Sequence, residues 1–323
     1  MECGDIDALQ STDNRPAVRC ASARSANFSK ARLTEAKMAG VDLSGARLEG
    51  AELEGAELAQ ARLSGANFAG AHLDRADLSG SRALGANFRL ASLYGADLGG
   101  AGLELTDFTS AALEGANLSV AGLAGARLRN ARLEGASLQR ARLMGADMAG
   151  AKLQASDWTN ALVWRAVPPA SEDTMLADMT QLVLRPPAPD ELAGLGSLAE
   201  ATSGALKPRL LDAVARLRNG PESAAWASSA DQQLWQGLIR SSEATADTYK
   251  GRLTDYLARL MCRARFADGA VAGGIARRAL APGFKGDLAA IYDRLKGADC
   301  LAGRAMGQTL MRDLAAVGDV ARP

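Results

Sequence analysis

Apolar side chains recur every five residues through the first half of the chain. From Phe28 to Val163 every fifth position is apolar, mostly Leu, Phe or Met, and an Ala stands two positions before it almost every time. Residues five apart are rotated by about 140° on an α-helix and fall on alternate faces of a flat strand. The pattern therefore predicts a chain that turns a corner every five residues, always in the same sense.

The repeated unit, A-x-L-x-G, indicates how each corner is built. Ala and Leu are two positions apart, so both point inward from an extended segment while the residue between them points outward. Gly is frequent at the last position, where it supplies the positive φ that a type II turn requires. Where another residue replaces this Gly, we expect a type I turn; such residues include Gln60, Arg75, Leu90, Val120 and Arg140.

The spacing of the aromatic residues predicts four units per coil. Phe28, Phe68, Phe88 and Phe108 are separated by multiples of twenty residues. They fall in one column only if a coil contains four units of five. We therefore expect a square β-solenoid in which one column stacks aromatic rings, a contact that contributes about 0.5–1.5 kcal/mol per pair beyond burial.

With these repeats, the array resembles the pentapeptide-repeat family. Members of that family form right-handed quadrilateral β-helices, with the central Leu or Phe and the preceding Ala inside a narrow core. The resemblance covers residues 26–165, about 28 units or seven coils. It implies the fold of this segment, whereas the family is functionally diverse and the resemblance alone identifies no activity.

The segments that flank the array differ from it in composition. Residues 1–25 are polar and irregular, and we expect an N-terminal cap or a disordered segment, with Pro16-Ala17-Val18 and Ala21-Ser22-Ala23 as degraded units. An open β-helix end exposes unpaired strand edges, so it requires a cover. Residues 166–202 are rich in proline, which stops strand pairing, and we interpret them as a linker with one short helix near Ser171–Val183.

A helical period replaces the five-residue period from about residue 203. Apolar side chains between Tyr249 and Ala264 follow helical spacing and form one stripe. Further helices are predicted at Leu206–Arg218, Glu222–Ile239, Asp268–Leu280, Asp287–Leu295 and Leu301–Val317. We expect residues 203–323 to form one all-α domain of about 120 residues. The fold class is therefore α+β multidomain, a right-handed quadrilateral β-helix followed by an all-α C-terminal domain.

Charge, cysteine content and hydropathy bear on the possible partners, the redox environment and the location of the protein. The chain of 323 residues has 37 basic and 37 acidic side chains, so no net field attracts it to nucleic acid or anionic lipid. Cys262 and Cys300 can face each other across two helices, but we favour two buried thiols in a reducing compartment. The start lacks the pattern of a signal peptide, and no segment has 18 consecutive apolar residues, so we predict a cytoplasmic protein without a membrane span.

The sequence contains no catalytic constellation. His72 is the only histidine, and it occupies an outward position of the array, where a solvated side chain is expected. No phosphate-binding or dinucleotide-binding glycine motif is present, and no cysteine spacing indicates a metal site. We therefore predict no enzymatic activity, no cofactor and no metal.

The outward positions remain as candidates for binding. Arginines gather near residues 127–142, and a second basic pair lies on another face, whereas one outward column is acidic in its middle. An evenly charged, solvated rod is the simpler interpretation of these positions. The candidate partner contacts are Arg62, Arg82, Arg127, Arg129, Arg132, Arg140, Arg142, Asp77 and Asp97.

These surfaces favour a protein-interaction or scaffold protein, because solenoids present extended binding faces. The partner is a protein of unknown identity, and a homodimer through the C-terminal helices is a further expectation. The resemblance implies an alternative, a DNA-mimicking regulator or protector of a type II topoisomerase. Residues 26–165 carry 15 acidic and 15 basic side chains, so they imitate a polyanion poorly, and direct nucleic-acid binding is not expected. The tail also resembles the region that follows the array in larger proteobacterial proteins with membrane helices.

Overall fold

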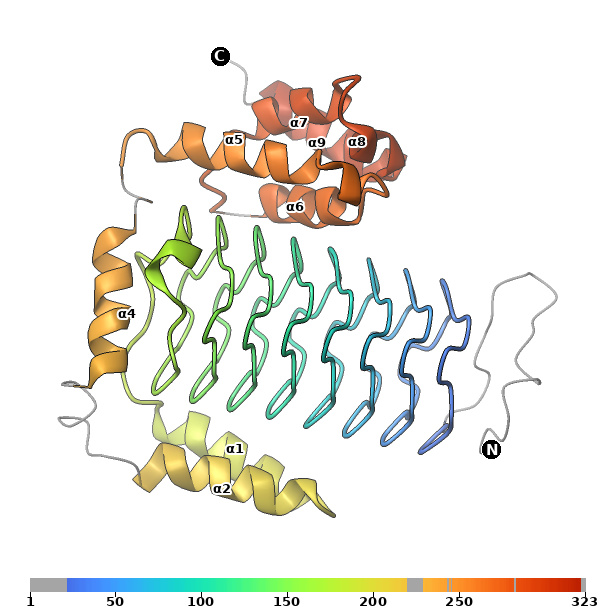
Figure 1. Cartoon of the computed structure of the whole chain (residues 1–323), viewed down its shortest axis with the longest axis vertical. Helices are drawn as coiled ribbons and strands as arrows, with labels where there is room; N and C mark the ends of the chain where they lie inside the picture. The colour runs from blue at the N-terminus through green and yellow to red at the C-terminus, as the bar shows by residue number, and fades with distance from the viewer. Residues whose placement is uncertain (1–21, 220–228, 243, 245, 282, 321–323) are drawn as a thin grey trace.

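The chain folds into a stack of flat coils with helices above it, below it and across one end (Figure 1). The computed structural model describes residues 22–219, 229–242, 244, 246–281 and 283–320. The degraded unit predicted at Pro16-Ala17-Val18, most of the predicted N-terminal cap and the first residues of the helix predicted at Glu222–Ile239 lie outside these described residues.

The coil of twenty residues is confirmed by the backbone ladder. Outward residues pair in parallel with the residue twenty positions later, from Ser22 with Asp42 to Asp147 with Val167. The amide of Leu48 donates to the carbonyl of Asn67 over 2.7 Å, and the amide of Asn67 donates to the carbonyl of Ala46 over 2.9 Å. Each coil is therefore hydrogen-bonded to the coils on both sides, which gives the stack four ladder faces.

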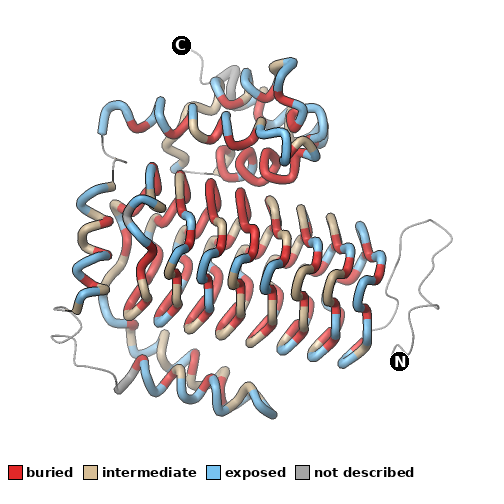
Figure 2. The backbone as a smooth tube through the Cα atoms, viewed as in Figure 1, coloured by how far each residue is buried: buried red, intermediate tan, exposed pale blue. Residues whose placement is uncertain are grey.

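The inward columns form one continuous core, and Figure 2 shows buried segments along the coils of the stack. The predicted Leu column, from Leu33 to Leu153, is at most 1% exposed. The rings of Phe68 and Phe88 stack with centroids 4.8 Å apart, and those of Phe88 and Phe108 with centroids 4.9 Å apart. The assignment of inward and outward positions and the aromatic column are both confirmed.

The corners correct one prediction, because residues that replace Gly do not switch to a type I turn. They take the same left-handed conformation as the glycines, with φ between 55° and 64° at Gln60, Arg75, Leu90, Val120 and Arg140. The ladder on both sides of each corner fixes the turn, so the tertiary structure overrides the local preference of the side chain. Val120 is the most strained of these residues, because a β-branched side chain rarely adopts positive φ.

Replacing Val120 by Gly should therefore stabilise the solenoid. The valine side chain is 50% exposed, so little burial is lost. Removing a left-handed, branched residue relieves roughly 1–2 kcal/mol, and the greater freedom of glycine in the unfolded chain offsets part of it. We expect a net gain of about 1 kcal/mol in the free energy of unfolding, measured by denaturant titration. A loss of stability would contradict the assignment of strain to this corner.

The solenoid continues beyond the predicted boundary at residue 165. Asp157 pairs with Asp178 and Leu162 pairs with Val183, a spacing of 21 instead of 20 residues. The additional residue is accommodated where the short helix η2 (Ser171–Thr174) lies. Much of the expected linker is therefore a last, distorted coil, and the predicted short helix is limited to four residues.

Helices α1 (Pro189–Ala201) and α2 (Leu206–Asn219) lie along one corner of the solenoid, below the coils in Figure 1. They share an apolar cluster with side chains of that corner, among them Leu84, Met144 and Trp164. The helix predicted at Leu206–Arg218 is confirmed within one residue.

Helix α4 (Ala230–Ser241) covers the C-terminal end of the stack. Its Trp235 is fully buried, its ring centroid lies 6.1 Å from that of Trp158, and its indole N–H donates to the carbonyl of Ala166 over 2.9 Å. This helix therefore closes the edge that an open β-helix would expose.

The remaining helices form a bundle on the opposite corner. They are α5 (Tyr249–Met261), η3 (Ala264–Phe266), α6 (Ala270–Leu280), α7 (Leu288–Lys296), α8 (Leu301–Ala305) and α9 (Gln308–Val320). The single helix expected at Leu301–Val317 is divided before Gln308. The expected single helical domain is not observed, because three groups of helices pack on three different parts of the solenoid.

Helix α6 approaches the solenoid closely through glycines on both sides. A Cβ atom added at Gly274 would lie 2.1 Å from the carbonyl oxygen of Gly115 and 2.9 Å from the Cα of Gly95. A Cβ atom at Gly95 would lie 2.0 Å from the carbonyl oxygen of Ala270. Glycine is required at both sides, because any Cβ atom would overlap the backbone of the other side. This contact fixes the position of the bundle.

The cysteines near the ends of α5 and α8 correct the expectation of free thiols. Cys262 and Cys300 form a disulfide across 38 positions of sequence, so their pairing, which the sequence disfavoured, is observed. Because disulfides are rare in the cytosol, the bond does not support the predicted reducing environment, and the cytoplasmic location stays a prediction. Within the described part of the chain, no helix has the length and apolar character needed to cross a membrane.

Candidate functional site

The frequent Asp and Asn residues in outward positions have a structural role. Their side-chain oxygens accept hydrogen bonds from the backbone amide two residues later, as Asp77 does from Ser79 and Asp97 from Gly99, both over 2.9 Å. Asn117 also donates to Asp97 over 2.9 Å. These bonds satisfy backbone amides at the corners, so the acidic residues alone do not indicate a binding site.

The acidic column predicted as a contact surface lies beside helix α6. Arg277 donates to the carbonyl of Gly95, and its charge interacts with Asp97 and Asp77. Arg278, only 8% exposed, donates to the carbonyl of Gly135, with its Nε 4.0 Å from Asp157. The structure therefore satisfies much of this column within the chain, which reduces its value as a surface for a partner.

The predicted arginine band is divided between different faces. Arg127 lies 3.8 Å from Asp107, and Arg129 pairs with Asp147 on the same side of the solenoid. Arg132 is engaged within the chain, because its Nε lies 2.8 Å from Glu114 and its Nη2 donates to the hydroxyl of Tyr94 over 2.7 Å. Its side chain is still 37% exposed, but these bonds reduce its value as a partner contact.

The other predicted arginines lie on or beside the face that α1 partly covers. Arg62 lies 3.9 Å from Asp42, whereas Arg82 and Arg140 are exposed. Arg142 lines a cavity beneath α1 together with Glu104, whose burial raises the pKa of its carboxyl while the charge of Arg142 lowers it. The band is thus divided between two separate surfaces and the ion pair of Arg132 with the buried Glu114.

A buried carboxyl cluster joins the solenoid to the bundle. Glu114 is fully buried, pairs with Arg132 and lies 3.5 Å from Arg265, which lies beside α6. Burial, and then the charge of Glu134, raise the pKa of Glu114 to about 7. Burial also raises the pKa of Glu134, which is 6% exposed. One carboxylate oxygen of each glutamate lacks a hydrogen-bond partner among the described residues.

The sequence carried a signal for this cluster that the prediction missed. Tyr94, Glu114 and Glu134 are separated by twenty residues and each precedes a corner Gly. They therefore share one corner column, next to the glycines that α6 approaches. This column of the sequence therefore marks the corner on which the helical bundle packs.

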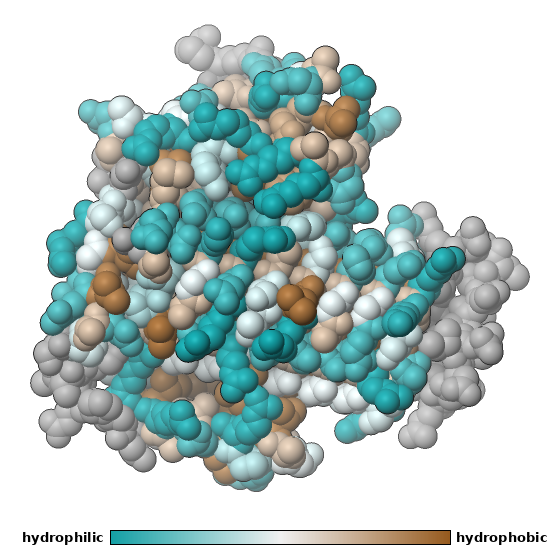
Figure 3. All heavy atoms as spheres, in the orientation of Figure 1, coloured by the Kyte–Doolittle hydropathy of each residue, from teal (hydrophilic) through white to brown (hydrophobic). Residues whose placement is uncertain are grey.

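One side of the solenoid is left uncovered by the helices, and we call it the open face. It consists of the column from Asn27 to Asp147 and the corner that follows this column, including Arg89 and Arg129. Its side chains alternate in charge and pair between coils, as in the contact of 3.4 Å between Arg89 and Asp107. Figure 3 shows one broad side of the coils as mostly hydrophilic, with scattered apolar residues.

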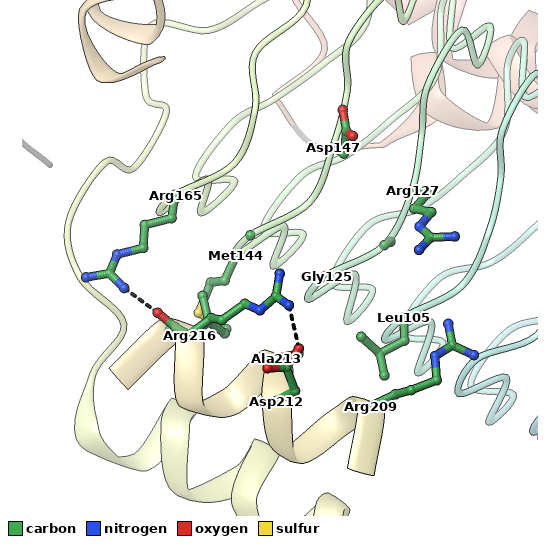
Figure 4. A pocket seen from close by; sticks show the side chains of 13 residues that line it. Leu105, Gly125, Arg127, Met144, Asp147, Arg165, Arg209, Asp212, Ala213 and Arg216 are labelled. Atoms are coloured by element: carbon green, nitrogen blue, oxygen red, sulfur yellow. Dashed lines mark hydrogen bonds and ion pairs between the residues drawn. The ribbon is translucent and has the colours of Figure 1, made fainter. Parts of the chain in front are cut away.

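A cavity of about 530 Å³ lies between helix α2 and the solenoid (Figure 4). The solenoid contributes Arg127 and Arg165, and α2 contributes Arg209 and Arg216. The carboxylates of its lining are Asp147 and Asp212, and its apolar lining includes Leu105, Met144 and Leu217. Of the four arginines only Arg127 was predicted as a contact.

Two features of the described residues bear on catalysis and metal binding. His72 is exposed and lies 4.0 Å from Glu54, without a nucleophile in a relay. Among the residues that the structure describes, no three His, Cys, Asp or Glu side chains gather around a common point that could hold a metal ion. The candidates that remain are the open face and the cavity beside α2.

Comparison with known proteins identifies the array. The model of the family described as pentapeptide repeats matches residues 26–65, 56–98, 86–121 and 121–160, with 8 copies. No curated protein matches the chain significantly.

Several solved structures match the chain. HetL, a pentapeptide repeat protein of the cyanobacterium Nostoc sp. strain PCC 7120 involved in heterocyst differentiation regulation, is 30% identical over 50% of this chain and 78% of its own length, with a TM-score of 0.28. QnrB1, a plasmid-mediated fluoroquinolone resistance protein, is 24% identical over 57% of this chain and 91% of its own, with a TM-score of 0.41. A pentapeptide repeat protein of the Arabidopsis thaliana thylakoid lumen is 28% identical over 47% and 88%, with a TM-score of 0.25.

Proposed function

The chain belongs to the pentapeptide-repeat family, whose repeats form a right-handed β-helix, and on this premise we propose that it is a non-enzymatic protein-interaction or scaffold protein. The observation that supports this proposal is the open face, a ladder of side chains that the helices leave uncovered along most of the array, up to the coils beside α2. Its backbone is fixed coil by coil, so a partner meets a surface that loses little conformational freedom on binding.

We assign the partner contacts to the open face, with Arg127 and Arg129 kept from the predicted set. These residues, together with Arg89, are exposed and share that side of the solenoid. Arg82 and Arg140 serve as a comparison because they are exposed on or beside the neighbouring face that α1 partly covers. Homodimerisation through the C-terminal helices remains a separate proposal, and light scattering of the purified protein tests it.

Charge reversal of matched sets of arginines tests the assignment. Arg89 and Arg129 are changed to Glu in one variant, and Arg82 and Arg140 in the other, so both change the charge equally. Arg127 is left unchanged because it also lines the cavity beside α2. Partners captured from the native cell by the wild-type protein should be lost from the first variant and kept by the second. The reverse result would move the contacts to the other side, and retention by both variants would exclude these arginines.

The alternative, a DNA-mimicking regulator of a type II topoisomerase, receives less support. A DNA duplex carries one negative charge per about 1.7 Å, and residues 26–165 have no net charge. Asp77 and Asp97, the acidic residues on which this alternative depends, lie beside Arg277. A supercoiling assay in which micromolar protein neither protects nor inhibits the enzyme would remove the alternative, and clear inhibition would favour it over the scaffold.

A further inference from the structure

The cavity beside α2 has the size and shape of a ligand site. Its volume of about 530 Å³ lies within the range of roughly 300–1,000 Å³ that small-molecule and peptide-anchor pockets occupy. Gly125 and Gly145, at the same corner of two successive coils, form part of its wall. A Cβ at Gly145 would lie 3.5 Å from Leu217 of α2, so the missing side chain leaves room between helix and solenoid.

The charges around the cavity do not cancel. Four arginines and two aspartates line it, and both aspartates already have partners. Asp212 pairs with Arg216 over 2.7 Å, and Asp147 pairs with Arg129, which lies outside the cavity. Arg127 lies 3.8 Å from Asp107, which does not line the cavity. Within the described residues, no carboxylate lies at ion-pair distance from Arg209. The cavity therefore carries an excess of positive charge.

The arginines surround an apolar surface. In Figure 4, Arg209 from α2 and Arg127 from the solenoid lie at the same end of the cavity as Leu105, while Arg165 lies at the other end and bonds to the backbone carbonyl of Arg216. Met144 contributes a further apolar wall. Two guanidinium groups with an apolar side chain near them match a ligand that has carboxylates close to an apolar group.

We propose that this cavity binds an acidic peptide segment of a protein partner. The carboxylates of the segment pair with Arg127 and Arg209, because the planar guanidinium binds a carboxylate with two parallel hydrogen bonds. An apolar side chain between the carboxylates packs on Leu105, which is only partly buried. A nucleic-acid backbone is a poorer match, because it offers no apolar side chain to pack on Leu105.

The inference rests on the proposed interaction function and adds the chemistry of the partner. Its probe is a fluorescein-labelled peptide, Glu-Glu-Leu-Glu-Glu, with binding to the full-length protein measured by fluorescence anisotropy at low salt. We expect Arg209→Glu to weaken binding at least tenfold. Arg140→Glu, an equal charge change at an exposed residue on another side, should alter binding less than twofold.

Three results would overturn the proposal. They are no binding of the acidic peptide, equal binding of Gln-Gln-Leu-Gln-Gln, and unchanged binding after Arg209→Glu. A 20-base-pair DNA duplex that binds with the same sensitivity to Arg209→Glu would also overturn it, because the ligand would then be a polyanion and not a peptide. Unchanged thermal unfolding of Arg209→Glu verifies that the variant is folded.

The two proposals fail in different ways. If the peptide does not bind but charge reversal of the open face still abolishes partner capture, the interaction function stands and the cavity is not its site. If the peptide binds through Arg209 while both sets of reversed arginines keep their partners, the cavity inference stands and the open-face assignment fails.

Discussion

Replacing Gly274 by Ala should lower the free energy of unfolding by about 3 kcal/mol, because overpacking at a rigid contact costs this much. The added Cβ would lie 2.1 Å from the carbonyl oxygen of Gly115, and backbone atoms on the solenoid cannot move aside as a flexible side chain can. The bundle must therefore shift away from the corner, which also disturbs the ion pair of Arg265 with Glu114. Denaturant unfolding measures the loss.

The neighbouring glycine supplies the control. A Cβ at Gly273 would have its nearest neighbour, an Arg277 nitrogen, at 3.7 Å, which is an ordinary contact. Gly273→Ala makes the same chemical change in the same helix, and it should be neutral or stabilising by up to about 1 kcal/mol because alanine favours the helix. Equal losses of stability in the two variants would refute the close glycine contact as the feature that positions the bundle.

The contact between the bundle and the solenoid should weaken as the pH rises. The pKa of Glu114 is about 7 in the folded protein and has an ordinary value of 4.5. The folded state therefore binds this proton more tightly than the unfolded state, so ionisation of Glu114 reduces stability as the pH rises from about 4.5 to 7. Below pH 4.5 the ionisation of Glu114 does not affect the free energy of unfolding. Above pH 7 it lowers the free energy of unfolding by its full amount, about 3 kcal/mol.

Glu114→Gln should remove this dependence. An amide keeps the size and one acceptor oxygen but does not ionise. We expect the stability of the wild-type protein relative to Glu114→Gln to fall by about 2–3 kcal/mol between pH 5 and pH 8, measured by denaturant unfolding at both values. Glu57→Gln, at an exposed outward position, is the matched control and should leave the pH dependence of the wild-type protein unchanged. The same pH dependence in both glutamine variants would exclude Glu114 as its source.

The solenoid was predictable because its signal is periodic and its contacts repeat. Phe68, Phe88 and Phe108 are spaced by twenty residues, and only one coil length places them in a column. The backbone ladder then fixes inward and outward positions without reference to the rest of the chain. The same ladder explains the error at Val120, where neighbouring coils impose a conformation that the side chain disfavours.

The positions of the helices could not be predicted in the same way. The period of residues 249–264 correctly indicated a helix with one apolar stripe, but a stripe does not identify the surface on which it packs. The contact of Gly274 with Gly115 joins residues 159 positions apart, and nothing local in either segment specifies the other. The disulfide of Cys262 with Cys300 depends on the same tertiary arrangement.

The cavity was predictable only in part. Arg127 was recognised because its column is regular, whereas Arg209 and Arg216 belong to a helix whose return to the solenoid is not encoded locally. Their spacing of seven residues, with Asp212 between them, does place all three on one side of α2. That pattern indicates a charged helix face, which is usually solvated, so the sequence alone gave no reason to connect it with Arg127.

The place at which the helices first meet the array has a consequence for evolution of the chain. Leu206 of α2 lies 3.6 Å from the position of a Cβ at Gly65, and Arg75 pairs with Asp268 of the bundle over 3.5 Å. Among the described residues, the coils before Gly65 make no such contact with a helix. Gain or loss of twenty residues before Gly65 would therefore change the reach of the rod in whole steps of about 4.8 Å and leave every helix in register. Homologues that differ in length should differ there, in multiples of twenty.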